Sequence, residues 1–431
     1  MRYNKRSPRS RLLSAHPAPK KHLAFCVIMA IGVLLAAEAM LRVLALSSRS
    51  VNALLSVDPV HSYLADRALL WRGNPEYPEH DRLGFRNPDV PSQVSIVALG
   101  DSQTYGARVS RDQAWPQQLQ RVEKSPTYNM AFPGWGPPQS LLVLDQAIGM
   151  NPRLIIEAVY TGNDLVNSFT FVYRKKRLTR LRSTDEQVLQ SIGAAEKADD
   201  WDDNGLVDQD PIDTSKSRNG QDRRGSIGER IAAHSELYGL WNALNRAAAY
   251  YARRSATAEL DDEADSATSD EALRFENAWF KTMLSPGYRL TAVKLADPRV
   301  QEGLRITVDV LSQMHEQCAA ANVHFAVLLV PTKELALREA IYAERAEVPP
   351  TYTTMVEDED AVRRELREQL TTRQVPFVDA LPTLSALARN GDLPYSETKD
   401  GHLNAPGHRA VAELVRSAIE QQRLLSASRG S

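Results

Sequence analysis

The chain has 431 residues, of which 43% are hydrophobic and 25% are charged, and its formal net charge is −2. This is an ordinary globular composition, long enough for one large domain or two smaller ones, and it offers no basic excess for a nucleic-acid partner. Cys26 and Cys318 are the only cysteines in the sequence, too few for a disulfide framework.

The N-terminus carries seven basic and no acidic residues over positions 1–22, followed by an apolar run over 23–46. As a helix rising about 1.5 Å per residue, this run is long enough to cross roughly 30 Å of hydrocarbon. Glu38 and Arg42 interrupt it, but they are four residues apart and can pair on a helix. We expect a cytoplasmic tail at 1–22 and a single-pass membrane anchor at 23–46, with everything beyond in the periplasm. A cleaved signal peptide and a buried core helix are the alternatives.

From residue 93 onward, short apolar runs alternate with helical patterns, which predicts parallel βαβ units. The predicted strands are 94–99, 128–132, 154–160, 324–330 and 375–378. The predicted helices are 115–122, 139–150, 300–321, 358–372 and 407–423. We therefore expect an α/β fold with three layers, α/β/α, around a mostly parallel five-stranded sheet.

The domain plan follows from where this pattern begins and stops. Residues 47–92 contain many Gly and Pro breakers and are predicted to be a connector. The α/β domain is expected at 93–164 and 291–423. Between these parts, a basic cluster and an acidic low-complexity segment interrupt the alternation, so 165–290 is predicted to be an insertion, part helical and part disordered.

Four polar motifs stand at the predicted carboxyl ends of strands or before the last helix, where an open parallel sheet binds its ligands. They are Gly100-Asp101-Ser102, the segment from Asn129 to Gly134, Thr161-Gly162-Asn163-Asp164, and the segment from Lys399 to Asn404. Each motif alone is weak, because turns are rich in Gly, Asn and Asp. Their order along the chain makes the combination specific.

Together the four motifs resemble the SGNH (GDSL-type) hydrolase superfamily. The segments D-R-L-G-F-R-N (81–87) and V-P-T-K-E (330–334) are similar to membrane-anchored bacterial members related to polysaccharide O-acetyltransferases of the alginate-acetylation type. The resemblance implies a flavodoxin-like fold and a serine hydrolase acting on acyl esters, for example acetyl esters, of a carbohydrate or cell-envelope substrate. An O-acetyltransferase acting on an exopolysaccharide is one alternative. A non-catalytic glycan-binding or envelope-assembly protein on the same fold, with partner proteins, is the other.

The expected catalytic residues are Ser102 as nucleophile, His402 as its base, and Asp400 as the group that orients the imidazole. The backbone N–H groups of Ser102 and Gly134 and the side-chain amide of Asn163 are expected to form the oxyanion hole. The alternatives are that Ser102 caps a helix, that His402 is an ordinary loop residue, and that Asn163 forms a structural turn.

The resemblance departs from the common family pattern at two positions. The family usually places its Asp three residues before the His, where this chain has Lys399, so the shorter spacing from Asp400 must serve. Ala131 also replaces a frequent glycine in the second motif. The motifs contain no metal-ligand spacing, so neither a metal nor a cofactor is expected.

Overall fold

The computed structural model of the chain describes residues 20–47, 61–198, 272–345 and 347–422, and the single positions 237, 240, 241 and 244. The chain divides into two compact units. One comprises Met1–Pro59 and Arg223–Arg254, and the other comprises Val60–Asp222 and Ser255–Ser431. The middle of the predicted insertion, 199–271, which includes its acidic segment, falls almost wholly outside the described residues.

Helix α1 (Lys20–Ser47) contains the segment predicted to be a membrane anchor. The expected pair forms, with Arg42 Nε donating to Glu38 Oε1 at 3.0 Å. This charged pair interrupts the apolar run in the second half of the helix. Across the part of the chain that the structure describes, no helix combines the length and the apolarity that a membrane crossing requires. The transmembrane anchor predicted at 23–46 is therefore not supported.

Five parallel strands form the central sheet of the second unit, in the order β4-β3-β5-β8-β9. Their bounds are β3 (Ile96–Leu99), β4 (Thr127–Asn129), β5 (Leu154–Tyr160), β8 (His324–Val330) and β9 (Phe377–Asp379). Ranked by position in the chain, the order is 2-1-3-4-5, which is the flavodoxin-like arrangement. The predicted five-stranded parallel sheet is thus confirmed. Strand β4 is shorter than predicted because residues 130–132 already lead into the turn that contains Gly134.

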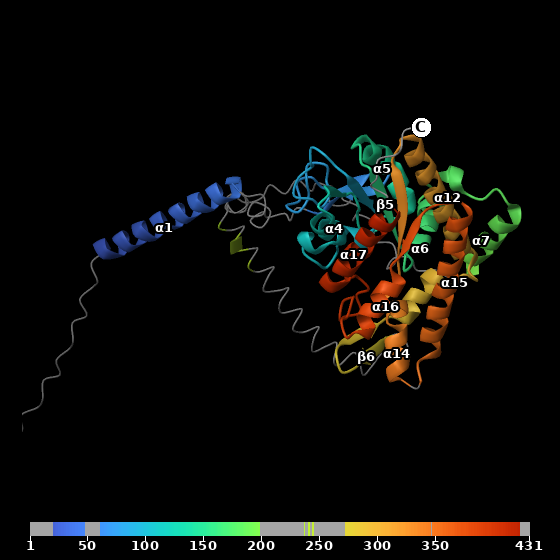
Figure 1. Cartoon of the computed structure of the whole chain (residues 1–431). Helices are drawn as coiled ribbons and strands as arrows, with labels where there is room; N and C mark the ends of the chain where they lie inside the picture. The colour runs from blue at the N-terminus through green and yellow to red at the C-terminus, as the bar shows by residue number, and fades with distance from the viewer. Residues whose placement is uncertain are drawn as a thin grey trace, which may run out of the picture. The chain divides into compact units, whose positions relative to one another are not determined.

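Helices cover both faces of this sheet (Figure 1). The helices described in this unit are α3 (Ser102–Tyr105), α4 (Trp115–Glu123), α5 (Pro137–Gly149), α6 (Asp164–Phe169), α7 (Glu186–Ala198), α11 (Pro286–Val293), α12 (Pro298–Ala320), α13 (Lys333–Ala336), α14 (Arg338–Glu344), α15 (Pro350–Thr372), α16 (Leu381–Arg389) and α17 (Ala405–Gln422). Helix α15 begins eight residues before its predicted start at 358. Its first turns contain threonines of modest helix propensity, but Tyr352 and Met355 bury their side chains in the core and stabilise them there.

Alternation along the strands divides the core into two layers, because successive side chains of a strand point to opposite faces. In β3, Val97 and Leu99 join the cluster that packs against α5, α6, α12 and α15. Ile96 and Ala98 join the cluster on the other face, with residues of α4, α16 and α17. The predicted three-layer α/β/α architecture is confirmed by this division.

Two short antiparallel hairpins extend the fold beyond the predicted α/β domain. The first, β1 (Tyr63–Asp66) with β2 (Leu70–Gly73), lies in the predicted connector, and its Trp71 is buried in the core together with Phe85. The second pairs β6 (Leu273–Glu276) with β7 (Lys281–Leu284). Residues 165–198 also pack into the core, through Phe169 among others. The described parts of the expected connector and insertion therefore contribute side chains to the core of the domain.

Candidate active site

The turn that contains the predicted nucleophile, Ser102, follows β3 directly. Gly100 has a φ of +141°, and a Cβ there would lie 2.7 Å from Thr104 Oγ1, so the turn needs a residue without a side chain. Asp101 precedes α3 as its N-cap and accepts a hydrogen bond from the Gln103 N–H at 2.9 Å. Ser102 is the first residue of this short helix and is 8% exposed. The helix-cap role thus falls to Asp101, which leaves the Ser102 hydroxyl available for other contacts.

Three side chains predicted to act together meet at this turn. Ser102 Oγ lies 2.9 Å from His402 Nε2, and His402 Nδ1 lies 2.5 Å from Asp400 Oδ1. The same Asp400 oxygen accepts the backbone N–H of His402 at 2.9 Å. Lys399 is exposed, so the carboxylate two residues before the histidine makes the contact that the common three-residue spacing would otherwise supply.

The second oxygen of Asp400 pairs with Arg108, whose Nε lies 2.5 Å from Oδ2. Arg108 comes from the loop after α3, has a φ of +70°, and is largely exposed. Burial opposes ionisation of Asp400, but the bonds to His402 and the nearby positive charges outweigh it, and the pKa of Asp400 falls below its usual value. An ionised Asp400 favours one tautomer of His402, with the proton on Nδ1 and a free acceptor at Nε2 facing the serine.

The other two predicted oxyanion donors follow neighbouring strands of the same sheet. Gly134 lies in the turn between β4 and α5 with a φ of +74°, a conformation that favours glycine. Asn163 lies between β5 and α6, three residues beyond the end of its strand, just as Ser102 lies three residues beyond the end of β3. Its side-chain oxygen has no hydrogen-bond partner among the described residues. No described hydrogen bond joins Gly134 or Asn163 to Ser102, so their place in the site rests on this shared sheet edge.

Two buried amides hold the parts of the site together, and the sequence pattern did not single out either side chain for this. Gln103, directly after the nucleophile, donates from Nε2 to the Gly401 carbonyl at 3.0 Å and accepts the Leu403 N–H at 3.0 Å. Asn129 donates from Nδ2 to the Thr104 carbonyl at 2.8 Å. The only available signal was position, since Gln103 directly follows the first motif and Asn129 begins the second, and both contacts join segments far apart in the chain.

Three fully buried carboxyl groups interact electrostatically near the nucleophile: Asp101, Glu157 and Asp164. Burial raises the pKa of Asp101 to about 6, against the opposing effects of the Gln103 N–H and of His402. Burial also raises the pKa of Glu157 and of Asp164 well above their usual values, and repulsion from Asp101 adds to both. The neutral forms of Glu157 and Asp164 are therefore favoured, whereas the ionised form of Asp400 is favoured.

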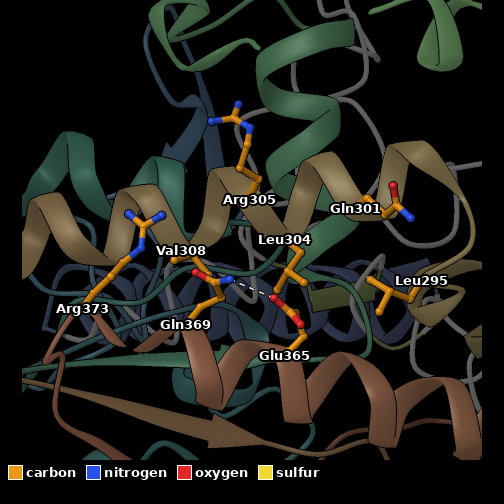
Figure 2. A pocket seen from close by; sticks show the side chains of 8 residues that line it. All are labelled: Leu295, Gln301, Leu304, Arg305, Val308, Glu365, Gln369 and Arg373. Atoms are coloured by element: carbon orange, nitrogen blue, oxygen red, sulfur yellow. Dashed lines mark hydrogen bonds between the residues drawn. The ribbon is translucent and has the colours of Figure 1, made fainter. Parts of the chain in front are cut away.

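A separate cavity of about 390 Å³ opens between α12 and α15 (Figure 2). It is lined by Leu295, Gln301, Leu304, Arg305, Val308, Glu365, Gln369 and Arg373. Its cations are already neutralised, since Arg305 pairs with Glu302 and both Arg305 and Arg373 pair with Asp309. None of the predicted site residues lines it, and its charges do not mark it as a second reaction centre.

Comparison with known proteins finds no matching family model and no matching curated protein. Solved structures do resemble the chain, and they include lipolytic and esterase-type hydrolases. A member of the lipolytic G-D-S-L family from Veillonella parvula is 10% identical, with a TM-score of 0.33, over 76% of this chain and 99% of that one. An extracellular lipase from Streptomyces rimosus is 10% identical, with a TM-score of 0.37, over 75% and 99%. An acetyl xylan esterase is 10% identical, with a TM-score of 0.34, over 76% and 100%.

Similarities of this size do not define an activity. The assignment of a reaction to this chain therefore depends on its own residues.

Proposed function

We propose that the chain is a serine ester hydrolase of the SGNH type. The observation that carries the proposal is the unbroken contact series from Ser102 Oγ to His402 Nε2, at 2.9 Å, and from His402 Nδ1 to Asp400 Oδ1, at 2.5 Å. These distances are within hydrogen-bond reach for a nucleophile, its base and the group that orients the base. The order of the motifs and their position at the carboxyl edge of a parallel sheet support the same reading.

The reaction begins when Ser102 Oγ attacks the acyl carbonyl carbon of an ester and His402 Nε2 takes the hydroxyl proton. Asp400 stabilises the resulting imidazolium. The tetrahedral oxyanion receives hydrogen bonds from the backbone N–H groups of Ser102 and Gly134 and from the Asn163 amide. The carbon–oxygen bond to the alcohol then breaks, and the alcohol leaves with the proton from His402. Water attacks the acyl-serine by the reverse sequence, which regenerates Ser102 and releases the acid.

The substrate class and the cellular location are proposals from the sequence. The substrate is an acyl ester, with acetyl the preferred acyl group, on a carbohydrate or cell-envelope molecule. The basic segment at 1–22 and the apolar run after it support export of the domain from the cytoplasm. A reporter enzyme fused after residue 60 tests the location: activity outside the cytoplasm supports export, and activity inside refutes it.

The reaction is tested with the purified chain and p-nitrophenyl acetate. We expect hydrolysis by the wild type, covalent labelling of Ser102 by a fluorophosphonate probe, and loss of both in Ser102→Ala. Glycan binding by a wild type that the probe does not label would instead indicate the non-catalytic alternative. Formation of an O-acetylated saccharide when a polysaccharide acceptor is added would identify a sugar hydroxyl as the acceptor and the protein as an acetyltransferase.

A further inference from the structure

A completely buried amine lies behind the loop that carries Asp400 and His402. It belongs to Lys333, the first residue of α13, in the turn that follows β8. Lys333 Nζ lies 2.6 Å from the Thr398 carbonyl oxygen and 3.1 Å from that of Asp400. The Ser396 carbonyl oxygen and Thr282 Oγ1 are each 3.3 Å away. An ammonium group has three N–H donors, so these four oxygens use its full capacity.

These contacts tie the loop to α13, while Gln103 ties the same loop to α3. Within the loop, the Ser396 N–H donates to the His402 carbonyl at 3.0 Å, which closes residues 396–402 into a compact turn. Gln103, adjacent to Ser102, donates to the Gly401 carbonyl of the same loop. The loop is thus held by two anchors, Gln103 in α3 and Lys333 in α13, which follow separate strands of the sheet, β3 and β8.

The energetic balance points to a role beyond filling space. A buried cation loses its hydration, and an apolar side chain of similar length would occupy the same volume without that cost. The charged groups near Lys333 are Glu334, Arg289 and Asp400. The two carboxylates stabilise the protonated form of Lys333, and the guanidinium of Arg289 destabilises it. The ammonium group donates directed hydrogen bonds to the backbone just before His402, which an apolar side chain cannot do.

We propose that Lys333 is a positioning residue that holds the carbonyls of 396–400 so that Asp400 reaches the imidazole of His402 from only two residues away. The inference rests on the proposed function, since it assigns Lys333 a part in aligning the proposed triad. The proposal also explains how an aspartate two residues before the histidine makes the contact with the imidazole that an aspartate three residues before it makes in the common family pattern. Lys333 acts through Asp400 and His402 and does not itself meet the substrate.

The positioning role predicts a particular alkaline limit to activity. Burial lowers the pKa of Lys333 to about 8, with Glu334 and Asp400 opposing the shift and Arg289 reinforcing it. As the pH rises through this value, the ammonium becomes an amine and its charge-assisted bonds to the loop weaken. Because burial disfavours the charged form, deprotonation of Lys333 does not destabilise the fold. Activity should therefore fall above about pH 8 with no parallel fall in thermal stability.

The test compares Lys333→Met, Lys333→Arg and the control Lys281→Met, which removes an exposed lysine beside Thr282 on β7. Rates on p-nitrophenyl acetate are measured from pH 6 to 9.5 with the full chain, after subtraction of the uncatalysed rate. We expect Lys333→Met to lower kcat by about 10²-fold with little change in KM, as for a slight misplacement of reacting groups. Lys333→Arg should recover part of kcat and lose the alkaline fall, since guanidinium stays charged. Lys281→Met should behave as the wild type.

A folded Lys333→Met with wild-type kcat would overturn the proposal, as would an alkaline fall in Lys333→Arg identical to that of the wild type. If Lys333→Met does not fold, the proposal is tested by comparing the pH profile of the wild type with that of Lys333→Arg. A wild type inactive on esters refutes the proposed function, and hydrogen exchange then tests the loop by itself. Faster amide exchange over 395–404 in Lys333→Met than in Lys281→Met supports the anchoring of the loop, and equal exchange refutes it.

Discussion

Replacing Asp400 with asparagine separates the proposed triad from a chance meeting of polar side chains. The substitution keeps the shape of the side chain but removes the charge, and it places an amide opposite His402 Nδ1. In the transition state the imidazole becomes an imidazolium whose Nδ1 lies 2.5 Å from the Asp400 oxygen. Taking about 4 Å between the centres of charge and an effective dielectric constant of about 20, the lost attraction is about 4 kcal/mol.

That energy corresponds to a fall in kcat of roughly 10³-fold, and loss of the favoured tautomer extends it toward the 10⁴-fold seen when a serine protease triad loses its carboxylate. KM should change little, because Asp400 acts on the histidine and not on the bound substrate. The measurement is steady-state hydrolysis of p-nitrophenyl acetate by the full chain. Asp112→Asn is the matched control, since it removes the same charge from an exposed side chain that pairs with Arg121.

A kcat for Asp400→Asn within tenfold of the wild type would refute the reasoning. The rival carboxylate is Asp101, whose Oδ2 accepts a hydrogen bond from Ser102 Oγ at 3.4 Å. If Asp101 rather than Asp400 supported the reaction, Asp101→Asn would show the large loss and Asp400→Asn would not.

Three further outcomes are expected. Ser102→Ala should lower kcat by about 10⁴- to 10⁶-fold and abolish fluorophosphonate labelling, while its urea unfolding midpoint stays near that of the wild type. If the variant hydrolysed the ester as fast as the wild type, Ser102 would be excluded as the nucleophile. Gly100→Ala should lower the free energy of unfolding by about 2–4 kcal/mol, because its φ is +141° and its Cβ would lie 2.7 Å from Thr104 Oγ1. Gly149→Ala, whose Cβ meets nothing within 4 Å, is the control, and equal effects would contradict the argument. Asp101→Asn keeps the cap acceptor but removes a carboxyl whose pKa is raised to about 6. The contribution of this group to the free energy of unfolding of the wild type falls as the pH rises from about 4 to 6. The free energy of unfolding of the variant, relative to that of the wild type, should therefore rise by up to about 3 kcal/mol by pH 7. A difference between the two proteins that does not change with pH would refute the assignment.

Local patterns in the sequence were sufficient for the sheet and for the candidate nucleophile. Strands buried on both faces appear as continuous apolar runs, and two of them, 154–160 and 324–330, were predicted with the bounds that the structure has. The motif at Ser102 was recognisable because a strand ends there and small polar residues follow at once. Packing overrode local pattern elsewhere, as at the start of α15, where Tyr352 and Met355 are held by the core.

The first hairpin and the residues after α6 show a second limit. Breakers and charge clusters made 47–92 and 165–290 look separate from the domain, yet Trp71 and Phe169 are buried in its core. Around Phe169 the signal was present, since Leu165 and Val172 are also buried and lie at helical spacing from it, but the charge cluster that follows dominated the prediction. The membrane anchor at 23–46 was likewise predicted from hydropathy, and no described helix meets the requirement.

The sequence by itself determined which reactive groups the chain has and that they stand at strand ends, because both depend on residues close together in the chain. It could not decide whether Asp400, two residues before His402, would face the imidazole. That choice belongs to the tertiary structure: Gln103 and Lys333, about 300 and 70 residues away in the sequence, bind different carbonyls of the loop, and Arg108 binds the carboxylate itself. The direction of a loop side chain is set by such long-range hydrogen bonds, which no local pattern records.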